Sequence, residues 1–133
     1  MTATSKKVPL FFGPLPAKAL SGALDLDIEI GDVVMSFNAQ KHARKRHPVD
    51  YARCLPHVAA VINNPLYARD DFNNDGKIEL VGKPGGMTDY LLVAVELTID
   101  THGRYNVTSF YPISEGKVER RRESRHLVRV AII

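Results

Sequence analysis

The chain has 133 residues, 44% of them hydrophobic, and this length fits one domain that buries its own core. Its one cysteine, Cys54, excludes an internal disulfide framework, and we expect Cys54 to act as a small buried hydrophobe. The formal net charge is +3 and no apolar run approaches the roughly 18 residues of a membrane span, so we expect no membrane partner and a cytoplasmic location.

The N-terminal part predicts an irregular lead-in followed by a short β-region. Residues 1–23 are rich in proline and glycine, which indicates irregular structure. Apolar residues alternate with acidic ones over 24–30, and this period of two predicts a strand with one buried face. A turn at Gly31-Asp32 is then expected to lead into a second short strand over 33–35.

Two helices are expected next. Ser36 or Asn38 is a suitable N-cap for a helix whose body is AQKHARKRH. Pro48 ends this helix, because proline disfavours helical geometry in the residue before it. A second helix is predicted over 49–63, with a break or restart at Pro56.

The second half of the chain predicts antiparallel strands. Residues 77–83, 90–99 and 105–113 have strand composition, and short turn-forming segments separate them. The charged segment 115–125 predicts a helical turn or a long loop, and 126–133 predicts a closing strand. Helices followed by strands are typical of an α+β domain rather than of a parallel doubly wound sheet.

Lysine and arginine are concentrated in two clusters. Such clusters favour a polyanionic partner, and two solvated helix faces are the alternative interpretation. The clusters are Lys41, Arg44, Lys45 and Arg46, and Lys117, Arg120, Arg121, Arg122, Arg125 and Arg129.

The first helix carries a candidate catalytic group. His42 and Arg46 are four residues apart and therefore share a helix face, while His47 lies at the helix end. Two imidazoles can supply a base and an acid near neutral pH, and a guanidinium can clamp a phosphate with two parallel hydrogen bonds. These groups can cleave RNA through attack of its own 2′-hydroxyl, with no metal ion and no cofactor. A pair of surface histidines on a basic helix is the alternative.

The strand over 105–113 carries a second candidate group. Ser109 and Tyr111 point to one face of this strand and Phe110 to the other. Two hydroxyls beside a basic segment suit a platform for a phosphate and a base, and tyrosine can stack on a base. The alternative is an ordinary amphipathic strand with one solvated face.

Six blocks follow one another in an order that resembles a known family. They are H-A-R-K-R-H-P, INNPLYA, KIEL, YLLVAVEL, SFYPI and a K-x-x-x-R-R tail. Over residues 33–127 this order resembles the phage-associated barnase/EndoU/colicin/RelE-like nucleases. The resemblance implies one α+β domain over 1–133, with N-terminal helices packed on a four- to five-stranded antiparallel sheet. It also implies an endoribonuclease that acts on an RNA substrate.

Matched by position, the resemblance assigns two sets of site residues. In one respect the chain departs from the expected pattern: Glu123, Ser124, Arg125 and His126 stand where a tight glycine-containing turn is expected. The implied catalytic residues are His42, Arg46, His47, Ser109 and Tyr111, and the implied substrate-binding residues are Lys41, Lys117, Arg121 and Arg122.

Two other functions fit the same residues. A non-catalytic nucleic-acid-binding module would use the same basic faces, and a metal-dependent nuclease would use Asp70, Asp71 and Asp75. A phage factor and a toxin are both open roles for a ribonuclease. A cognate inhibitor protein is the further partner that such an activity usually requires.

Two loops imitate ligand-binding motifs. Residues 71–78 match the start of a calcium-binding loop, but Gly82 stands where its bidentate glutamate belongs, so a hairpin turn at 74–76 is the better interpretation. Residues 82–86 lack the spacing of a phosphate-binding loop and predict a hairpin connection. His57 and His102 are expected to be structural or exposed.

Overall fold

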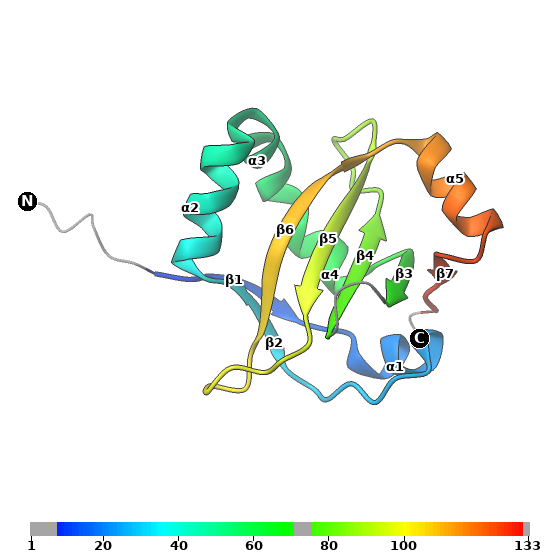
Figure 1. The fold of residues 1–133 in the computed structure, drawn as a ribbon, viewed down its shortest axis with the longest axis horizontal. Helices are drawn as coiled ribbons and strands as arrows, with labels where there is room; N and C mark the ends of the chain where they lie inside the picture. The colour runs from blue at the N-terminus through cyan, green and yellow to red at the C-terminus, as the bar shows by residue number, and fades with distance from the viewer. Residues whose placement is uncertain (1–7, 71–75, 132–133) are drawn as a thin grey trace, which may run out of the picture.

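The fold is α+β, and one mixed sheet of seven strands organises it (Figure 1). The computed structural model describes residues 8–70 and 76–131. In chain order the elements are β1 (Leu10–Pro14), α1 (Ala17–Leu24), β2 (Asp32–Met35), α2 (Phe37–Arg46), α3 (Pro48–Cys54), the 3₁₀ helix η2 (Leu55–His57), α4 (Val58–Asn63), β3 (Tyr67–Asp70), β4 (Lys77–Gly82), β5 (Tyr90–Glu96), β6 (Tyr105–Ile113), α5 (Glu115–Glu123) and β7 (Val128–Arg129).

The sheet is larger than the four to five antiparallel strands expected from the sequence. Its order is β1-β2-β6-β5-β4-β3-β7, and the β2–β6 pair is parallel whereas the other pairs are antiparallel. The additional strands are β1 and β3. β1 pairs with β2, whereas β3 pairs with the next strand, β4, and with the distant β7. Local composition predicts such pairing poorly, because a strand is stabilised by its neighbours as much as by its own residues.

The lead-in expected over 1–23 contains regular structure in its described part. β1 pairs with β2, and a register shift between Phe11 and Gly13 accommodates the turn-forming residues of β1. Gly13 has a φ of 94°, which glycine adopts without steric cost. Pro16 is the N-cap of α1, so proline here precedes a helix instead of preventing one.

The strand expected over 24–30 is absent, and the chain there runs along the core without pairing in the sheet. Asp25, in the left-handed conformation, ends α1, and the Ser21 hydroxyl then accepts a hydrogen bond from the Ile28 amide at 3.1 Å. Leu26 is partly buried and Ile28 is buried, whereas Ile30 is 90% exposed. The alternation therefore reflects one-sided burial of an extended segment.

The two predicted helices form as expected. Ser36 caps α2, because its hydroxyl accepts a hydrogen bond from the Ala39 amide at 3.2 Å. Pro48 ends α2 and occupies the first turn of α3, where its missing N–H leaves no helical bond unmade. The expected break at Pro56 is the short helix η2, which separates α3 from α4.

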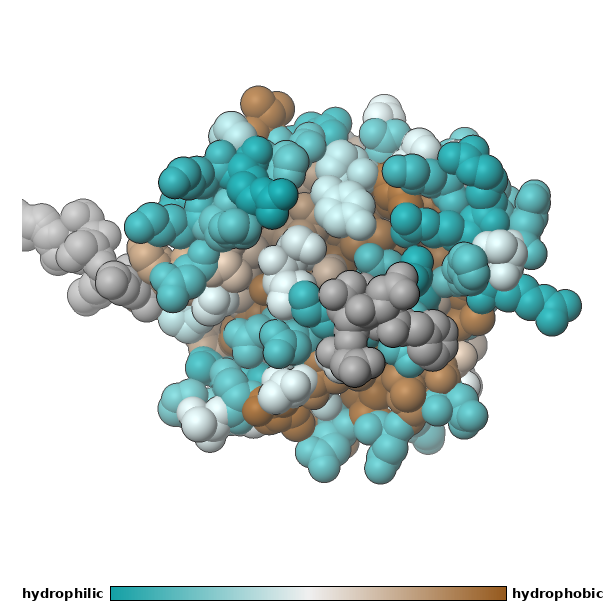
Figure 2. Space-filling model, in the orientation of Figure 1, coloured by the Kyte–Doolittle hydropathy of each residue, from teal (hydrophilic) through white to brown (hydrophobic). Residues whose placement is uncertain are grey.

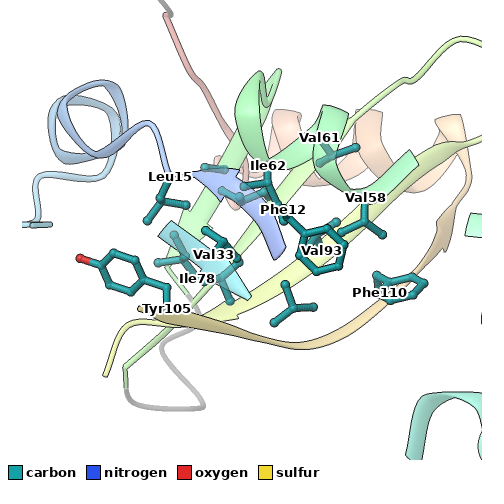
Figure 3. Packing of buried hydrophobic residues seen from close by; sticks show 14 of the residues in the cluster. Phe12, Leu15, Val33, Val58, Val61, Ile62, Ile78, Val93, Tyr105 and Phe110 are labelled. Atoms are coloured by element: carbon teal, nitrogen blue, oxygen red, sulfur yellow. The ribbon is translucent and has the colours of Figure 1, made fainter. Parts of the chain in front are cut away.

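The main core lies between the sheet and α4. Val58, Val61 and Ile62 of α4 belong to the same buried cluster as Phe12 and Val93 of the sheet (Figure 3). Cys54 is fully buried in this cluster, as expected. Because successive strand residues point to opposite faces, Leu92 belongs to a second cluster that Val118 of α5 covers from the other face.

The end of the chain differs from the expectation. Most of the segment 115–125 forms the helix α5, which Ser114 caps. Of the strand expected over 126–133, the described residues 126–131 contain only the two residues of β7. After α5, the amide of His126 bonds to the carbonyl of Arg121, and Arg125 has a φ of 65°. This is the helix ending that usually places glycine at the left-handed position.

The structure tests only one of the two loops that resemble ligand-binding motifs. Most of the hairpin turn expected at 74–76 and of the calcium-like loop at 71–78 falls on residues 71–75, which lie outside the described residues. Gly76 is described and has a φ of 77°. Residues 82–86 connect the antiparallel pair β4 and β5, as expected for a hairpin connection. Within residues 8–70 and 76–131, no helix combines the length and the apolar character that a membrane crossing requires.

Replacing the N-cap of α2 tests how the site-bearing helix is anchored. Ser36→Ala should lower the free energy of unfolding by about 1 kcal/mol, because the Ala39 amide loses its acceptor. Ser36→Asp should retain most of the stability, since aspartate also caps helices and suits the positive helix N-terminus. Urea denaturation measures both values, with Ser124→Ala at the exposed end of α5 as the control. Equal losses for the alanine and aspartate variants would contradict this role.

Candidate active site

The short length of β2 leaves part of β6 without a strand neighbour. β2 pairs with β6 only through Val33–Tyr105 and Val34–Asn106. Among the described residues, no other strand joins β6 on that side, so its later part forms an open sheet edge. The helices α2 and α3 follow β2 and pack beside this edge, as Figure 1 shows at the left of the molecule.

A hollow of about 480 Å³ lies between α2, α3 and the open edge of β6. The structure brings both candidate groups of the sequence together here, because His42, Arg46 and His47 line it from the helices and Ser109 and Tyr111 from the strand. The remaining lining residues are Ala43, Asp50, Tyr51, Thr108, Phe110 and Pro112.

The helix side of the hollow presents two exposed imidazoles and a guanidinium. Nη1 of Arg46 lies 3.4 Å from Nε2 of His42, as the four-residue spacing predicts. A guanidinium only donates hydrogen bonds, so this contact is a hydrogen bond when Nε2 of His42 carries no proton. His47 occupies the junction of α2 and α3, and its carbonyl accepts the Tyr51 amide at 2.8 Å.

A β-bulge shapes the strand side. Ala94 pairs with Ser109 whereas Val95 pairs with Val107, so Thr108 is an extra residue in β6. Such an extra residue bends a strand and redirects its side chains. Beyond the bulge, Ser109 and Tyr111 share the sheet face opposite the main core, and Tyr111 is 39% exposed.

Aromatic rings form the base of the hollow. Tyr51 is buried, and its ring lies 5.5 Å from that of Phe110 between centroids. The Arg44 guanidinium lies 6.0 Å from the Tyr51 ring centroid. Burial raises the pKa of the Tyr51 phenol, and the charge of Arg44 opposes this effect. The phenol is therefore neutral at physiological pH.

Three polar residues of the hollow were missed by the sequence analysis. Asp50 and Tyr51 follow His47 by three and four residues, so helical spacing was the signal that indicated them. The Asp50 carboxylate pairs with Arg53 at 3.3 Å, and this ion pair is exposed. No local sequence pattern indicated Thr108, because the position of a bulge depends on the partner strand. Its hydroxyl lies 3.5 Å from the Ala94 carbonyl.

The basic tail residues do not line this hollow. α5 packs Val118 onto the second cluster, which turns its arginines toward β3 and β4. Arg121 lies 4.0 Å from the Glu79 carboxylate, and the Arg122 guanidinium lies 4.8 Å from the Tyr67 ring centroid. Neither Lys117 of α5 nor Lys41, an exposed residue of α2, lines the hollow.

Other candidate residues are placed away from the hollow. Of the three aspartates considered for a metal-dependent nuclease, only Asp70 is among the described residues. In the described ranges, no group of three or more histidine, cysteine or acidic side chains is arranged to hold a metal ion. His57 is half-buried in η2 and His102 is exposed in the turn before β6, in agreement with the sequence expectation.

Comparison with known proteins gives one match. The family model described as phage-Barnase-EndoU-ColicinE5/D-RelE like nuclease3 matches residues 11–120. This range contains every element that lines the hollow, and it begins within β1. No curated protein and no solved structure matches the chain.

The buried tyrosines predict a loss of stability in alkaline solution. Burial raises the pKa of the phenols of Tyr51, Tyr90 and Tyr105 above the ordinary value of 10.0. The unfolded chain loses these protons first, so the free energy of unfolding should fall as the pH rises beyond about 10. Thermal melting from about pH 8 to about pH 11, with phenolate absorbance in parallel, measures this fall. Tyr51→Phe should reduce it, and a constant melting temperature over this range would contradict the assignment.

Proposed function

Because the chain belongs to the phage-Barnase-EndoU-ColicinE5/D-RelE like nucleases, we propose that the hollow beside β6 is the active site of a metal-independent endoribonuclease. The observation that supports this proposal is that His42, His47 and Arg46 share one hollow with Ser109 and Tyr111. The family itself supports the coarser statement that the chain is a nuclease acting on nucleic acid.

The two histidines divide the proton transfers. One imidazole takes the proton of the 2′-hydroxyl as this oxygen attacks the adjacent phosphorus. The other gives a proton to the departing 5′-oxygen, so the P–O5′ bond breaks and a 2′,3′-cyclic phosphate forms. His42 and His47 are both exposed to solvent within the hollow, where a phosphodiester has access to them. The reaction consumes no water in this first step.

Positive charge stabilises the phosphorane-like transition state. Arg46 lies beside His42, and its planar guanidinium can donate two parallel hydrogen bonds to phosphate oxygens. The other cations of α2 are exposed, and their charge attracts the RNA strand toward the hollow. Figure 2 shows hydrophilic side chains gathered over this helix. These cations are Lys41, Arg44 and Lys45.

The β6 residues hold the nucleotide. Ser109 lines the hollow, and its hydroxyl can donate a hydrogen bond to a phosphate oxygen. The exposed ring of Tyr111 offers a surface on which a base can stack. RNA is the preferred substrate because the attacking group is the 2′-hydroxyl, which DNA lacks.

Replacing either histidine should abolish cleavage. His42→Ala and His47→Ala should each lower the rate of RNA cleavage by about 10² to 10⁴, because each removes one proton transfer. Cleavage by the unchanged chain should persist in a chelator and leave 2′,3′-cyclic ends, while His102→Ala, in the exposed turn, is the matched control. Gel analysis and mass spectrometry of the products measure both effects.

Other outcomes of this experiment identify the alternatives. Salt-sensitive RNA binding by folded protein without any product would indicate a non-catalytic binding module. Loss of cleavage in chelator would indicate a metal-dependent nuclease. Cleavage that survives both histidine replacements would place the active site elsewhere in the chain.

Arg46 offers a separate test of phosphate stabilisation. Arg46→Lys keeps the charge but loses the two parallel hydrogen bonds, so kcat/KM should fall about tenfold. Arg46→Ala should lower it further, since the charge is lost as well. Arg120→Lys, on the exposed surface of α5, is the control and should leave kcat/KM unchanged. Equal activity of the Arg46→Lys variant and the unchanged chain would exclude a paired contact.

A further inference from the structure

A second hollow lies near the opposite end of the sheet, at the end of β3 and the turn after α5. Its volume is about 170 Å³, which suits a single small ring system. β7 pairs only with Tyr67 and Ala68, so Arg69 and Asp70 extend beyond it on that side of β3. The lining residues are Ala23, Leu24, Ala68, Arg69, Asp70, Arg125, His126 and Val128.

Arg125 adopts a backbone conformation that favours glycine. Its φ is 65°, at the left-handed position of the turn that ends α5. A side chain strains the backbone there, and such residues are found more often where the side chain has a function. Arg125 belongs to the lining of the hollow, together with His126.

The lining has the chemistry of a nucleotide-binding site. Ala23, Leu24 and Val128 provide an apolar wall against which a base can pack. Arg125 and His126 provide donors for a phosphate, and the Asp70 carboxylate can accept a hydrogen bond from an amino or hydroxyl group. This mixture of groups fits the base of a nucleotide, with the phosphate at the rim of the hollow, better than a free anion, because Asp70 would repel an anion alone.

A row of paired residues connects the two hollows across the sheet. Ser109 pairs with Ala94, Ala94 with Glu79, and Glu79 with Arg69, so all four lie on one face. Three strand spacings of about 4.8 Å separate Ser109 from Arg69, a total of about 14 Å. A single RNA strand advances by at least the roughly 3.4 Å per nucleotide of a duplex strand, so about four nucleotides or fewer cover this distance.

The row gives the separation of the two hollows and is itself largely covered, because Ala94 is 8% exposed and the Glu79 side chain 13%. An RNA strand that reaches both hollows passes over the side chains that cover the row. Glu79 is the one acidic member, and its carboxylate lies 3.2 Å from the Arg69 guanidinium and 4.0 Å from that of Arg121. Two guanidiniums therefore offset one carboxylate. Figure 2 shows further hydrophilic side chains over α5.

We propose that the hollow at Arg125 is a second nucleotide-binding subsite, which holds a nucleotide of the same strand that is cleaved beside β6. The identity of the ligand as an RNA strand rests on the proposed function. Arg125 binds the phosphate of this nucleotide, and its base packs against the apolar wall. The subsite strengthens the binding of long substrates and leaves short ones unaffected.

Binding of 2′-O-methyl RNA tests the subsite without cleavage, because the attacking hydroxyl is blocked. Fluorescence anisotropy would compare a single-stranded decamer with a dinucleotide. Arg125→Gly should weaken decamer binding about tenfold and leave dinucleotide binding unchanged. The slope of log binding constant against log salt concentration should become less steep by about one. The same variant should raise the melting temperature by about 3 °C, because glycine relieves the backbone strain.

Two further variants make the result decisive. Arg120→Ala removes an equal charge from the exposed surface of α5 and should change decamer binding less than twofold. Arg125→Asn, which also tolerates the left-handed conformation, should reproduce the binding loss of Arg125→Gly. Unchanged decamer binding, an equal loss with Arg120→Ala, or an equal loss for the dinucleotide would each overturn the subsite.

The experiments can contradict the proposed function and the proposed subsite independently of each other. If unmodified RNA is never cleaved but decamer binding depends on Arg125, the endoribonuclease is wrong and the subsite stands. If RNA is cleaved and decamer binding does not depend on Arg125, the subsite is wrong and the endoribonuclease stands. If the decamer does not bind at all, the subsite is overturned.

Discussion

The arrangement of the candidate site depends on how far β2 pairs with β6. Backbone pairing ends after two residue pairs, and the chain then turns into α2 instead of continuing along the sheet. A longer β2 would cover the open edge of β6, and the hollow would be filled by main chain. Both candidate groups therefore meet only because one strand is short.

The junction at His47-Pro48 is the second determinant of the site. Proline at the start of α3 requires no hydrogen-bond acceptor for its nitrogen, so a new helix begins immediately after α2. His47 remains at the corner, and the first turn of α3 brings Asp50 and Tyr51 to the same hollow. The ring of Tyr51 then packs on Phe110, which joins the helix pair to the open strand edge.

Sequence analysis identified features that depend on local interactions. The cap at Ser36, the contact between His42 and Arg46, and the strand over 105–113 all follow from neighbouring residues. Local patterns did not predict β1, the parallel pairing of β2, or the four-residue strand β3, because partner strands stabilise each of them. The alternation over 24–30 was misleading, because burial of one side of an extended segment gives the same pattern with or without sheet pairing.

The parallel pairing of β2 and β6 also affects the biosynthesis of the protein. The helix that carries the histidines leaves the ribosome well before the strand that completes the hollow, since β3, β4 and β5 lie between them in the chain. Pairing over such a sequence distance is slow to form and comes late in folding. A nascent chain therefore has no assembled candidate site until β6 has left the ribosome and paired with β2.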